Sequence, residues 1–226
     1  MAKANRFYMI SEQQIQEYFP EHYNLEKGHR LELEKMLQGL LHEAKNGAFL
    51  EIGLGPKVRV ERAKLLKKLN IQYTGLDFQT VCDEHQATLT KEGVTDLEFI
   101  GNSVGTYLYN LIRLQRLGRK FDVIYLDGHH TMYTDFPAAF ACMPLLKEGG
   151  VIAFDDVRWT LANKEKNLKN SEFYKEMYDF SLYEQSEKEE RHIEVIIKEY
   201  LIPMFDMSIY EKYSLPSWIA LQRKTK

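Results

Sequence analysis

The sequence predicts an α/β fold in which a mostly parallel, twisted sheet carries helices on both faces. Three observations predict it. Apolar, strand-like runs alternate with amphipathic, helix-like runs between residues 48 and about 160, with short connections between them. A glycine turn, Gly53-Leu54-Gly55, follows the first of these strands, and polar residues follow the later ones. Such alternation is typical of a parallel sheet whose two faces are both buried.

The first 46 residues are expected to form a helical extension that packs on a main domain at residues 47–226. Ser11 can cap a short helix that reaches Tyr18 and is ended by Pro20. A second helix is expected at 26–45. The extension is rich in aromatic residues, which favours packing or a dimer contact over the alternative, a substrate lid.

Five strands and four helices are expected in the alternating region. The strands are placed at 48–53, 71–76, 97–100, 121–126 and 150–154, and the helices near 57–69, 80–92, 103–118 and 134–146. The runs at 121–126 and 151–154 are almost continuously apolar, as central strands of a parallel sheet are. Further along, we expect one helix at 187–201 and an antiparallel pair of strands at 206–212 and 218–222, which makes seven strands in all.

Composition indicates an ordinary globular protein rather than a membrane or nucleic-acid-binding one. The chain has 226 residues, 44% hydrophobic and 28% charged, and a formal net charge of -3. That charge argues against a nucleic-acid partner. No apolar run is long enough to span a bilayer, and the N-terminus lacks the apolar core of a secretory signal. Cys82 and Cys142 lack metal-site spacing, so we expect reduced thiols in a cytoplasmic protein.

Polar residues also follow the second and third strands, where ligands of such sheets bind. Asp77 stands 22 positions after Gly55, where a carboxylate can accept hydrogen bonds from both hydroxyls of a ribose. The alternative is that Asp77 caps the next helix. Asn102 and Ser103 follow the third strand. They could contact an adenine edge, although Ser103 could equally cap a helix.

The fourth and fifth strands end in acidic residues and histidines: Asp127-Gly128-His129-His130 and Asp155-Asp156. Neighbouring strands lie about 4.8 Å apart, so these carboxylates should converge above the sheet. A divalent cation or a hydroxyl-bearing substrate would relieve their repulsion. Either His129 or His130 could take a proton from a hydroxyl nucleophile. At least one of the two histidines is expected to be a plain loop residue.

These motifs resemble those of class I S-adenosylmethionine-dependent methyltransferases. The chain is most similar to a bacterial family of small O-methyltransferases with an Asp-Gly-x-His-x-Tyr motif after the fourth strand. The resemblance covers residues 48 to 157 and implies a Rossmann-like, seven-stranded methyltransferase fold with its last strand antiparallel. It rests on four stretches, at 51–55, 75–77, 121–128 and 145–156. The sequence departs from the family at Pro56-Lys57 and by one additional residue before Tyr133.

The resemblance also implies roles for individual residues. Glu51, Gly53 and Gly55 would line the methionine part of the cofactor, Asp77 would bind its ribose, and Asp127 would lie between cofactor and substrate. The full set of predicted cofactor-binding residues is Glu51, Gly53, Gly55, Asp77, Phe78, Asn102, Ser103 and Asp127. Some relatives hold a divalent metal such as Mg²⁺, and its ligands here would be Asp127, Asp155 and Asp156. The predicted catalytic residues are Asp127, His129 and His130.

The sequence therefore predicts in-line methyl transfer from S-adenosylmethionine to a small hydroxylated or phenolic molecule. The predicted partners are this small-molecule acceptor and a second copy of the chain in a homodimer. One alternative is a nicotinamide-dependent oxidoreductase, which would require a third glycine where Lys57-Val58 stands. Another is a cofactor-binding protein without catalytic activity.

Overall fold

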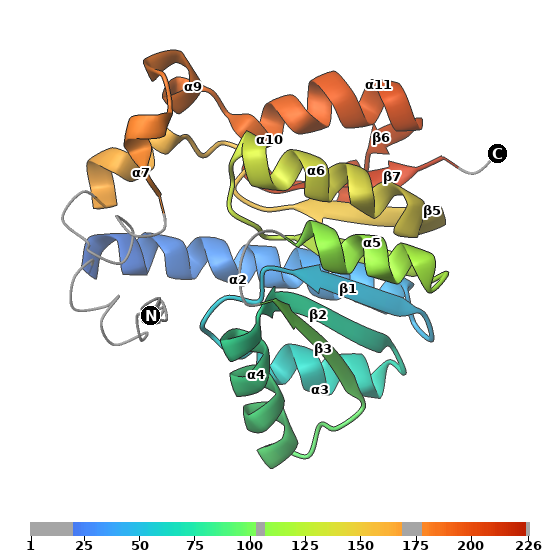
Figure 1. The fold of residues 1–226 in the computed structure, drawn as a ribbon. Coiled ribbons are helices and arrows are strands. Elements are labelled where there is room, and N and C mark those ends of the chain that lie inside the picture. The colour runs from blue at the N-terminus through green and yellow to red at the C-terminus, as the bar shows by residue number, and fades with distance from the viewer. Residues whose placement is uncertain (1–19, 103–106, 169–177, 225–226) are drawn as a thin grey trace, which may run out of the picture. The chain divides into compact units, whose positions relative to one another are not determined.

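The computed structural model describes residues 20–102, 107–168 and 178–224, and its centre is a seven-stranded sheet (Figure 1). The strand order is β3-β2-β1-β4-β5-β7-β6. The first five strands along the chain pair in parallel, whereas β7 is antiparallel to both β5 and β6. The predicted sheet, including its antiparallel end, is thus confirmed.

The strands are short and the helices follow them in alternation. The strands are β1 (Ala48–Ile52), β2 (Gln72–Phe78), β3 (Leu97–Asn102), β4 (Phe121–Leu126), β5 (Leu146–Phe154), β6 (Met207–Ile209) and β7 (Ile219–Arg223). The α-helices are α2 (Pro20–Glu43), α3 (Val60–Lys68), α4 (Gln79–Lys91), α5 (Leu108–Arg116), α6 (Met132–Cys142), α7 (Leu161–Leu168), α9 (Gln185–Glu189), α10 (His192–Val195) and α11 (Ile202–Phe205). The short 3₁₀ or π segments are η1 (Met143–Leu145), η2 (Phe180–Leu182), η3 (Ile196–Leu201) and η4 (Glu211–Tyr213).

The chain forms two compact units, and the larger one, residues 32–159 with 191–226, contains the whole sheet. The smaller unit combines residues up to 31 with residues 160–190. Helix α2 contributes to both. The domain boundary expected from the sequence, at residues 46 and 47, stays a prediction.

The two faces of the sheet differ in character. One face is apolar: Leu50, Ile52, Ile124 and Ile152 belong to a single buried cluster that also contains side chains of α5, α6 and η3. Because side chains alternate along a strand, the register places the residues between them on the other face. There Glu51 lies beside Tyr125, in a fully buried position of a central strand. Glu51 and Tyr125 therefore lie on the face opposite the apolar cluster.

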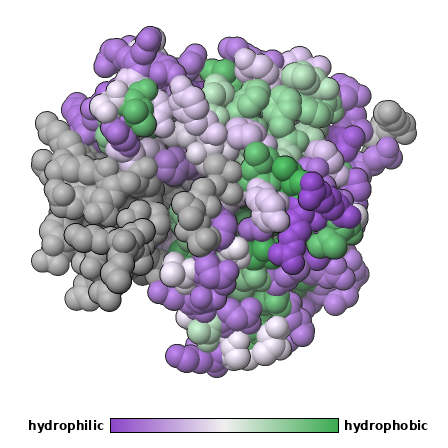
Figure 2. Space-filling view, viewed as in Figure 1, coloured by the Kyte–Doolittle hydropathy of each residue, from purple (hydrophilic) through white to green (hydrophobic). Residues whose placement is uncertain are grey.

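Apolar surface also gathers outside the core, over α6, η3 and α11. Ring centroids of Phe136 and Phe140 lie 4.6 Å apart, Tyr200 packs edge-on to Phe136, and Phe205 packs edge-on to Phe140. Figure 2 shows hydrophobic residues over this region. Within the described part of the chain, no helix combines the length and apolar character needed to cross a membrane.

The smaller unit is held by its own contacts. The Nζ atom of Lys164 donates to the hydroxyl of Tyr178 at 2.8 Å, and the Tyr178 ring stacks on Phe180 at 5.7 Å. Lys188 pairs with Glu165 at 3.0 Å. The sequence suggested an acceptor pocket from the aromatic residues of 173–183 and of the N-terminus. Residues 1–19 and 169–177, including the predicted helix from Ser11 to Tyr18, lie outside the described residues.

Three sequence-based boundaries are wrong. Helix α2 begins at Pro20, whose missing N–H suits a first helical position, and not near Glu26. Helix α3 begins at Val60 and not near Lys57, so the turn after β1 is longer than expected. The helix expected at 187–201 is interrupted, because Glu190 adopts an extended conformation between α9 and α10.

The end of α2 is fastened to the C-terminal segment. Glu43 accepts hydrogen bonds from the hydroxyls of Tyr210 and Tyr213, each at 2.9 Å, and pairs with Lys212 at 2.5 Å. One turn earlier in α2, the absence of a side chain at Gly39 leaves space for the Tyr213 ring. These contacts fix α2 against the strand pair that ends the sheet.

Replacing Glu43 by Gln tests this attachment. Burial by itself would raise the pKa of Glu43, but the hydrogen bonds from Lys212, Tyr213 and Tyr210 outweigh it and lower the pKa from its ordinary value of 4.5. The ionised carboxylate therefore stabilises the fold above the unfolded-state pKa, and this contribution is lost as the pH falls through the folded-state pKa. We expect Glu43→Gln to lower Tm by about 1–3 °C near pH 7, and the difference to shrink as the pH falls below 4.5. Thermal unfolding followed by circular dichroism measures it, and a difference independent of pH would contradict an ionic attachment.

Candidate functional site

The turn after β1 contains two glycines, and their surroundings differ. Gly53 and Gly55 have φ values of 84° and 65°, in the left-handed region. A Cβ atom on Gly53 would overlap the carbonyl oxygen of Asp127 at the end of β4. A Cβ atom on Gly55 would meet no atom within 4 Å. The turn is thus pressed against β4 at Gly53 and presents bare backbone to open space at Gly55.

Asp77, at the end of β2, holds this turn in place. Its Oδ2 atom accepts the backbone N–H of Leu54 at 2.7 Å and of Gly55 at 3.0 Å, while Oδ1 accepts the N–H of Phe78 at 2.6 Å. Burial raises the pKa of Asp77, and these hydrogen bonds oppose the rise. Asp77 therefore bonds both to the turn and to the last residue of β2. Oδ2 already accepts two N–H groups, and Oδ1 keeps acceptor capacity for a further donor.

His85 of α4 supports the turn from the other side. Its Nε2 atom lies 2.9 Å from the carbonyl oxygen of Gly55, which can only accept, so Nε2 carries the proton. Burial lowers the pKa of His85. A neutral imidazole thus donates to Gly55, which is a contact that sequence reasoning missed.

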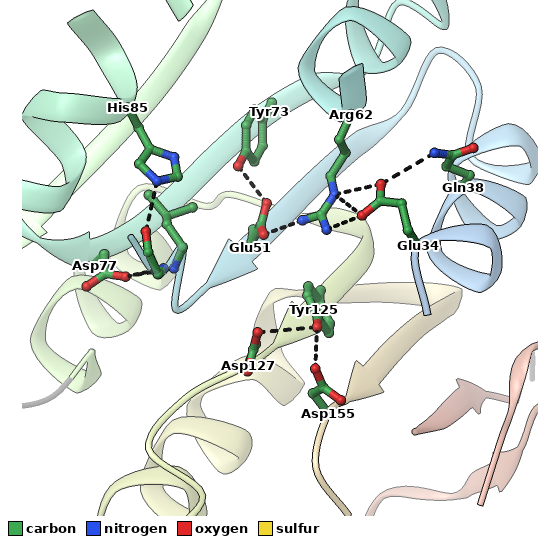
Figure 3. A network of polar contacts seen from close by, with 12 residues as sticks. Glu34, Gln38, Glu51, Arg62, Tyr73, Asp77, His85, Tyr125, Asp127 and Asp155 are labelled. Carbon is green, nitrogen blue, oxygen red and sulfur yellow. Dashed lines mark hydrogen bonds and ion pairs between the residues drawn. The ribbon is translucent and has the colours of Figure 1, made fainter. Parts of the chain in front are cut away.

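Glu51, in β1 just before the turn, belongs to a buried polar network (Figure 3). One carboxylate oxygen pairs with the guanidinium of Arg62, and the other accepts the hydroxyl of Tyr73 at 2.6 Å. Arg62 also pairs with Glu34 of α2, through Nε at 3.1 Å and Nη2 at 2.5 Å. The sequence predicted Glu51 as a site residue but not its partners, which lie 11 to 22 positions away.

A second group of polar residues lies at the ends of β4 and β5. The hydroxyl of Tyr125 is 2.9 Å from Oδ2 of Asp155 and 3.4 Å from Oδ2 of Asp127 (Figure 3). Burial and the like charges of Asp155 and Asp156 raise the pKa of Asp127 well above its usual range. The Asp127 side chain is still 37% exposed, so a ligand can reach it. A cation or a hydroxyl donor at this position would be stabilised.

The His130 ring lies close to two carboxylates. Its Nε2 atom lies 3.6 Å from Asp127 and 3.4 Å from Asp156, and its ring packs beside Trp159 at 5.6 Å. Both His130 and Asp156 adopt left-handed conformations, with φ of 60° and 52°. Strained conformations of this kind, away from glycine, are common at functional sites. With this backbone, the side chains of His130 and Asp156 do not follow the alternation between the two faces that is found along a strand.

Asp135, in the first turn of α6, shapes the loop that carries His130. Its oxygens accept the N–H groups of His129 at 3.2 Å and of Thr131 at 3.0 Å, and a Cβ atom on Gly128 would overlap Oδ1. Asp135 is fully buried. Sequence reasoning missed it. Its signal was an acidic residue in the first turn of a helix, where a negative charge is favourable.

The predicted adenine end is partly described. The Oδ1 atom of Asn102 is buried and has no hydrogen-bond partner among the residues that the structure describes. Ser103 lies outside those residues. A groove of about 340 Å³ adjoins this end at Gln79 and Gly101, and runs along β3 and α5 to Leu117. Only the end of the groove at Gln79 and Gly101 borders the predicted site, so the groove and the site are distinct.

Comparison with known proteins gives a consistent result. Residues 50–157 match a family described as a methyltransferase domain. No curated protein matches the chain.

Similar solved structures include the O-methyltransferase TomG from Streptomyces achromogenes, in complex with SAM (TM-score 0.53, 17% identity, covering 87% of this chain and 80% of that one). An O-methyltransferase from Bacillus cereus, in complex with SAH, gives a TM-score of 0.54 at 15% identity, covering 94% and 96%. The MycE methyltransferase of the mycinamycin pathway, in complex with Mg and SAH, gives 0.52 at 15% identity, covering 84% and 48%. At these identities the likeness is one of fold.

Replacing each glycine of the turn by alanine makes a matched pair. Both changes force a methyl group into a left-handed conformation, which costs about 1–2 kcal/mol. At Gly53 the methyl group also overlaps the Asp127 carbonyl, so we expect Gly53→Ala to lose at least about 3 kcal/mol of unfolding free energy. At Gly55 the conformational cost is expected alone. Urea unfolding measures both, and equal losses would contradict the close approach of β1 and β4.

Proposed function

Because residues 50–157 match a family of methyltransferase domains, we propose that the chain transfers a methyl group from S-adenosylmethionine to an oxygen of a small hydroxylated or phenolic molecule. The observation that carries the proposal is the convergence of Asp127, Asp156 and His130 at the strand ends, beside the bare glycine turn. Acidic residues there suit a sulfonium cofactor and would repel a pyrophosphate.

The cofactor would lie along the ends of β1 to β4. The space at Gly55 admits its methionine end, with Glu51 below the turn. Asp77 keeps acceptor capacity for the ribose hydroxyls, with Phe78 next to it. The buried, unpaired Oδ1 of Asn102 would accept the adenine amino group, and Ser103 stays a prediction. These features fit the predicted set of binding residues, because each offers the donor, acceptor or open space that its part of the cofactor needs.

For methyl transfer, the protein must align an acceptor hydroxyl and remove its proton. S-adenosylmethionine supplies an electrophilic methyl group and leaves as the neutral thioether. The acceptor oxygen forms the new bond to carbon, and its proton passes to the neutral imidazole of His130. Asp127 and Asp156 lie 3.6 Å and 3.4 Å from the Nε2 atom of that ring and stabilise the imidazolium that forms. Alignment by the strand ends accounts for the rest of the acceleration.

A divalent metal such as Mg²⁺ stays a prediction at Asp127, Asp155 and Asp156. Their carboxylate oxygens are of the type Mg²⁺ prefers. In residues 20–102, 107–168 and 178–224, however, no three His, Cys, Asp or Glu side chains are arranged to hold one ion together. The Tyr125 hydroxyl instead joins Asp155 to Asp127. As placed, these residues do not fit a metal ion, and the steps above use none.

Two alternatives differ in what the chain would bind. A nicotinamide-dependent oxidoreductase would need the pyrophosphate cradle of a third glycine, and Val58 stands there. A cofactor-binding protein without activity would bind S-adenosylmethionine yet methylate nothing. A homodimer also stays a prediction; the aromatic surface of Phe136, Phe140 and Phe205 would suit such a contact.

Calorimetric titration distinguishes these readings. We expect the wild-type chain to bind S-adenosylmethionine and its demethylated product with Kd values of about 1–100 µM, and NADH with none measurable. Gly55→Ala places a methyl group in the cofactor space and should weaken both by about tenfold or more. Adding Mg²⁺ or a chelator should leave both Kd values unchanged. Tight NADH binding would contradict the proposal. Acceptor methylation that depends on a metal ion would support the predicted metal site.

The two histidines offer a matched test of the base. Transfer of labelled methyl groups to a panel of phenols, catechols and polyols identifies the best acceptor of the wild type. With that acceptor, His130→Gln should lower kcat by about 10²–10⁴-fold and leave the Kd for S-adenosylmethionine within about twofold. His129→Gln, next to it in the same loop, should keep most of the activity. If His129→Gln lowers kcat by this factor and His130→Gln does not, the base is His129.

A further inference from the structure

Arg62 is the least exposed cationic group near the proposed site, and its surroundings are unusual. Its side chain is only 7% exposed and pairs with two carboxylates, Glu51 and Glu34. Burial alone would lower the pKa of Arg62, but these two carboxylates raise it well above its ordinary value. A buried charge is costly unless its partners satisfy it. Two acids around one guanidinium leave one net negative charge next to the glycine turn.

The Glu51 carboxylate is held at both oxygens. Arg62 pairs with one, and the Tyr73 hydroxyl donates to the other at 2.6 Å. Neither partner comes from the turn itself: Arg62 lies in the first turn of α3, and Tyr73 lies in β2. The orientation of Glu51 under the turn is therefore set from outside it. Loss of either partner would leave a buried carboxylate free to rotate or to take up a proton.

Arg62 also contacts the other half of the site. Its guanidinium carbon lies 5.8 Å from the centre of the Tyr125 ring. The hydroxyl of that ring donates to Asp155 and lies near Asp127. Figure 3 shows the Arg62 guanidinium between the carboxylates of Glu51 and Glu34, with the Tyr125 side chain below it. One guanidinium thus touches both the cofactor side and the acceptor side.

We propose that Arg62 is a positioning residue that holds the Glu51 carboxylate in the orientation that receives the cationic methionine end of the cofactor, and that Glu34 of α2 holds Arg62. The proposal rests on the proposed function, since it concerns the same cofactor. Glu34 uses both carboxylate oxygens on Arg62. Such bidentate pairing fixes the plane of a guanidinium, which a lysine could not reproduce.

The alternative is that Arg62 only fastens α2 and α3 to the sheet. In that case its loss would lower stability without changing ligand binding in the folded protein. Arg119 provides a matched control. It pairs with Glu98 at 2.8 Å, donates to the Thr74 hydroxyl at 3.0 Å and lies 5.7 Å from the Phe121 ring. Like Arg62, Arg119 pairs with a carboxylate and lies near an aromatic ring, but none of its partners belongs to the site.

The test measures Kd for S-adenosylmethionine and its demethylated product by calorimetry, with Tm recorded for each variant. We expect Arg62→Met to weaken S-adenosylmethionine binding by about tenfold or more, and Arg62→Lys and Glu34→Gln by smaller factors in that order. Arg119→Met should lower Tm but leave both Kd values within about twofold. Glu51→Gln combined with Arg62→Met should be scarcely weaker than the weaker single variant, because Arg62 acts through Glu51.

Three results would overturn the proposal. One is that Arg62→Met and Arg62→Lys bind S-adenosylmethionine as the wild type does, whatever their Tm. Another is that the losses from Glu51→Gln and Arg62→Met multiply in the double variant. If Arg62→Met does not fold, the test rests on Arg62→Lys and Glu34→Gln. Wild-type affinity of both variants for S-adenosylmethionine would then overturn the proposal. Absence of binding by the wild type itself would overturn the proposed function as well, which separates the two failures.

Discussion

The contact between the first glycine of the turn and the end of β4 is the constraint on which the site depends. Gly53 lies so close to the Asp127 carbonyl that no side chain fits between them. The N–H of Asp127 donates to Ile52 at 2.9 Å, and the N–H of Gly53 donates to Leu76 at 2.9 Å. The end of β1 is therefore joined through the backbone to β4 on one side and to β2 on the other. This brings the open space at Gly55 and the Asp127 carboxylate to the same edge of the sheet.

The second constraint is electrostatic. Glu51, Asp127 and Asp155 all point from one face or edge of the sheet, and their mutual repulsion must be compensated. Arg62 compensates the negative charge of Glu51, and the Tyr125 hydroxyl donates a hydrogen bond to Asp155. The Asp127 carboxylate remains accessible, and its pKa is raised by burial and by its acidic neighbours. A sulfonium cofactor and a hydroxyl acceptor are ligands that such a site stabilises, whereas a pyrophosphate would add further negative charge.

The fold alone would not have distinguished these ligands. Open parallel sheets bind many cofactors at their strand ends, and the solved structures compared with this chain share its fold at 17% identity or less. What narrows the choice is the particular set of side chains at that edge. Asp135 uses a fully buried carboxylate to hold the loop that carries His130, whose backbone is left-handed.

The sequence by itself determined the alternation of strands and helices, the glycine turn and the acids at the strand ends, because these follow from local periodicity and from residue types at element boundaries. It did not distinguish His129 from His130, or find Arg62, Tyr73 and Asp135. Those depend on the tertiary structure: strand register decides which residues share a face, and a left-handed backbone at His130 decides where its ring points. A pairing such as Glu34 with Arg62 joins residues 28 positions apart, and no local pattern in the sequence marks it.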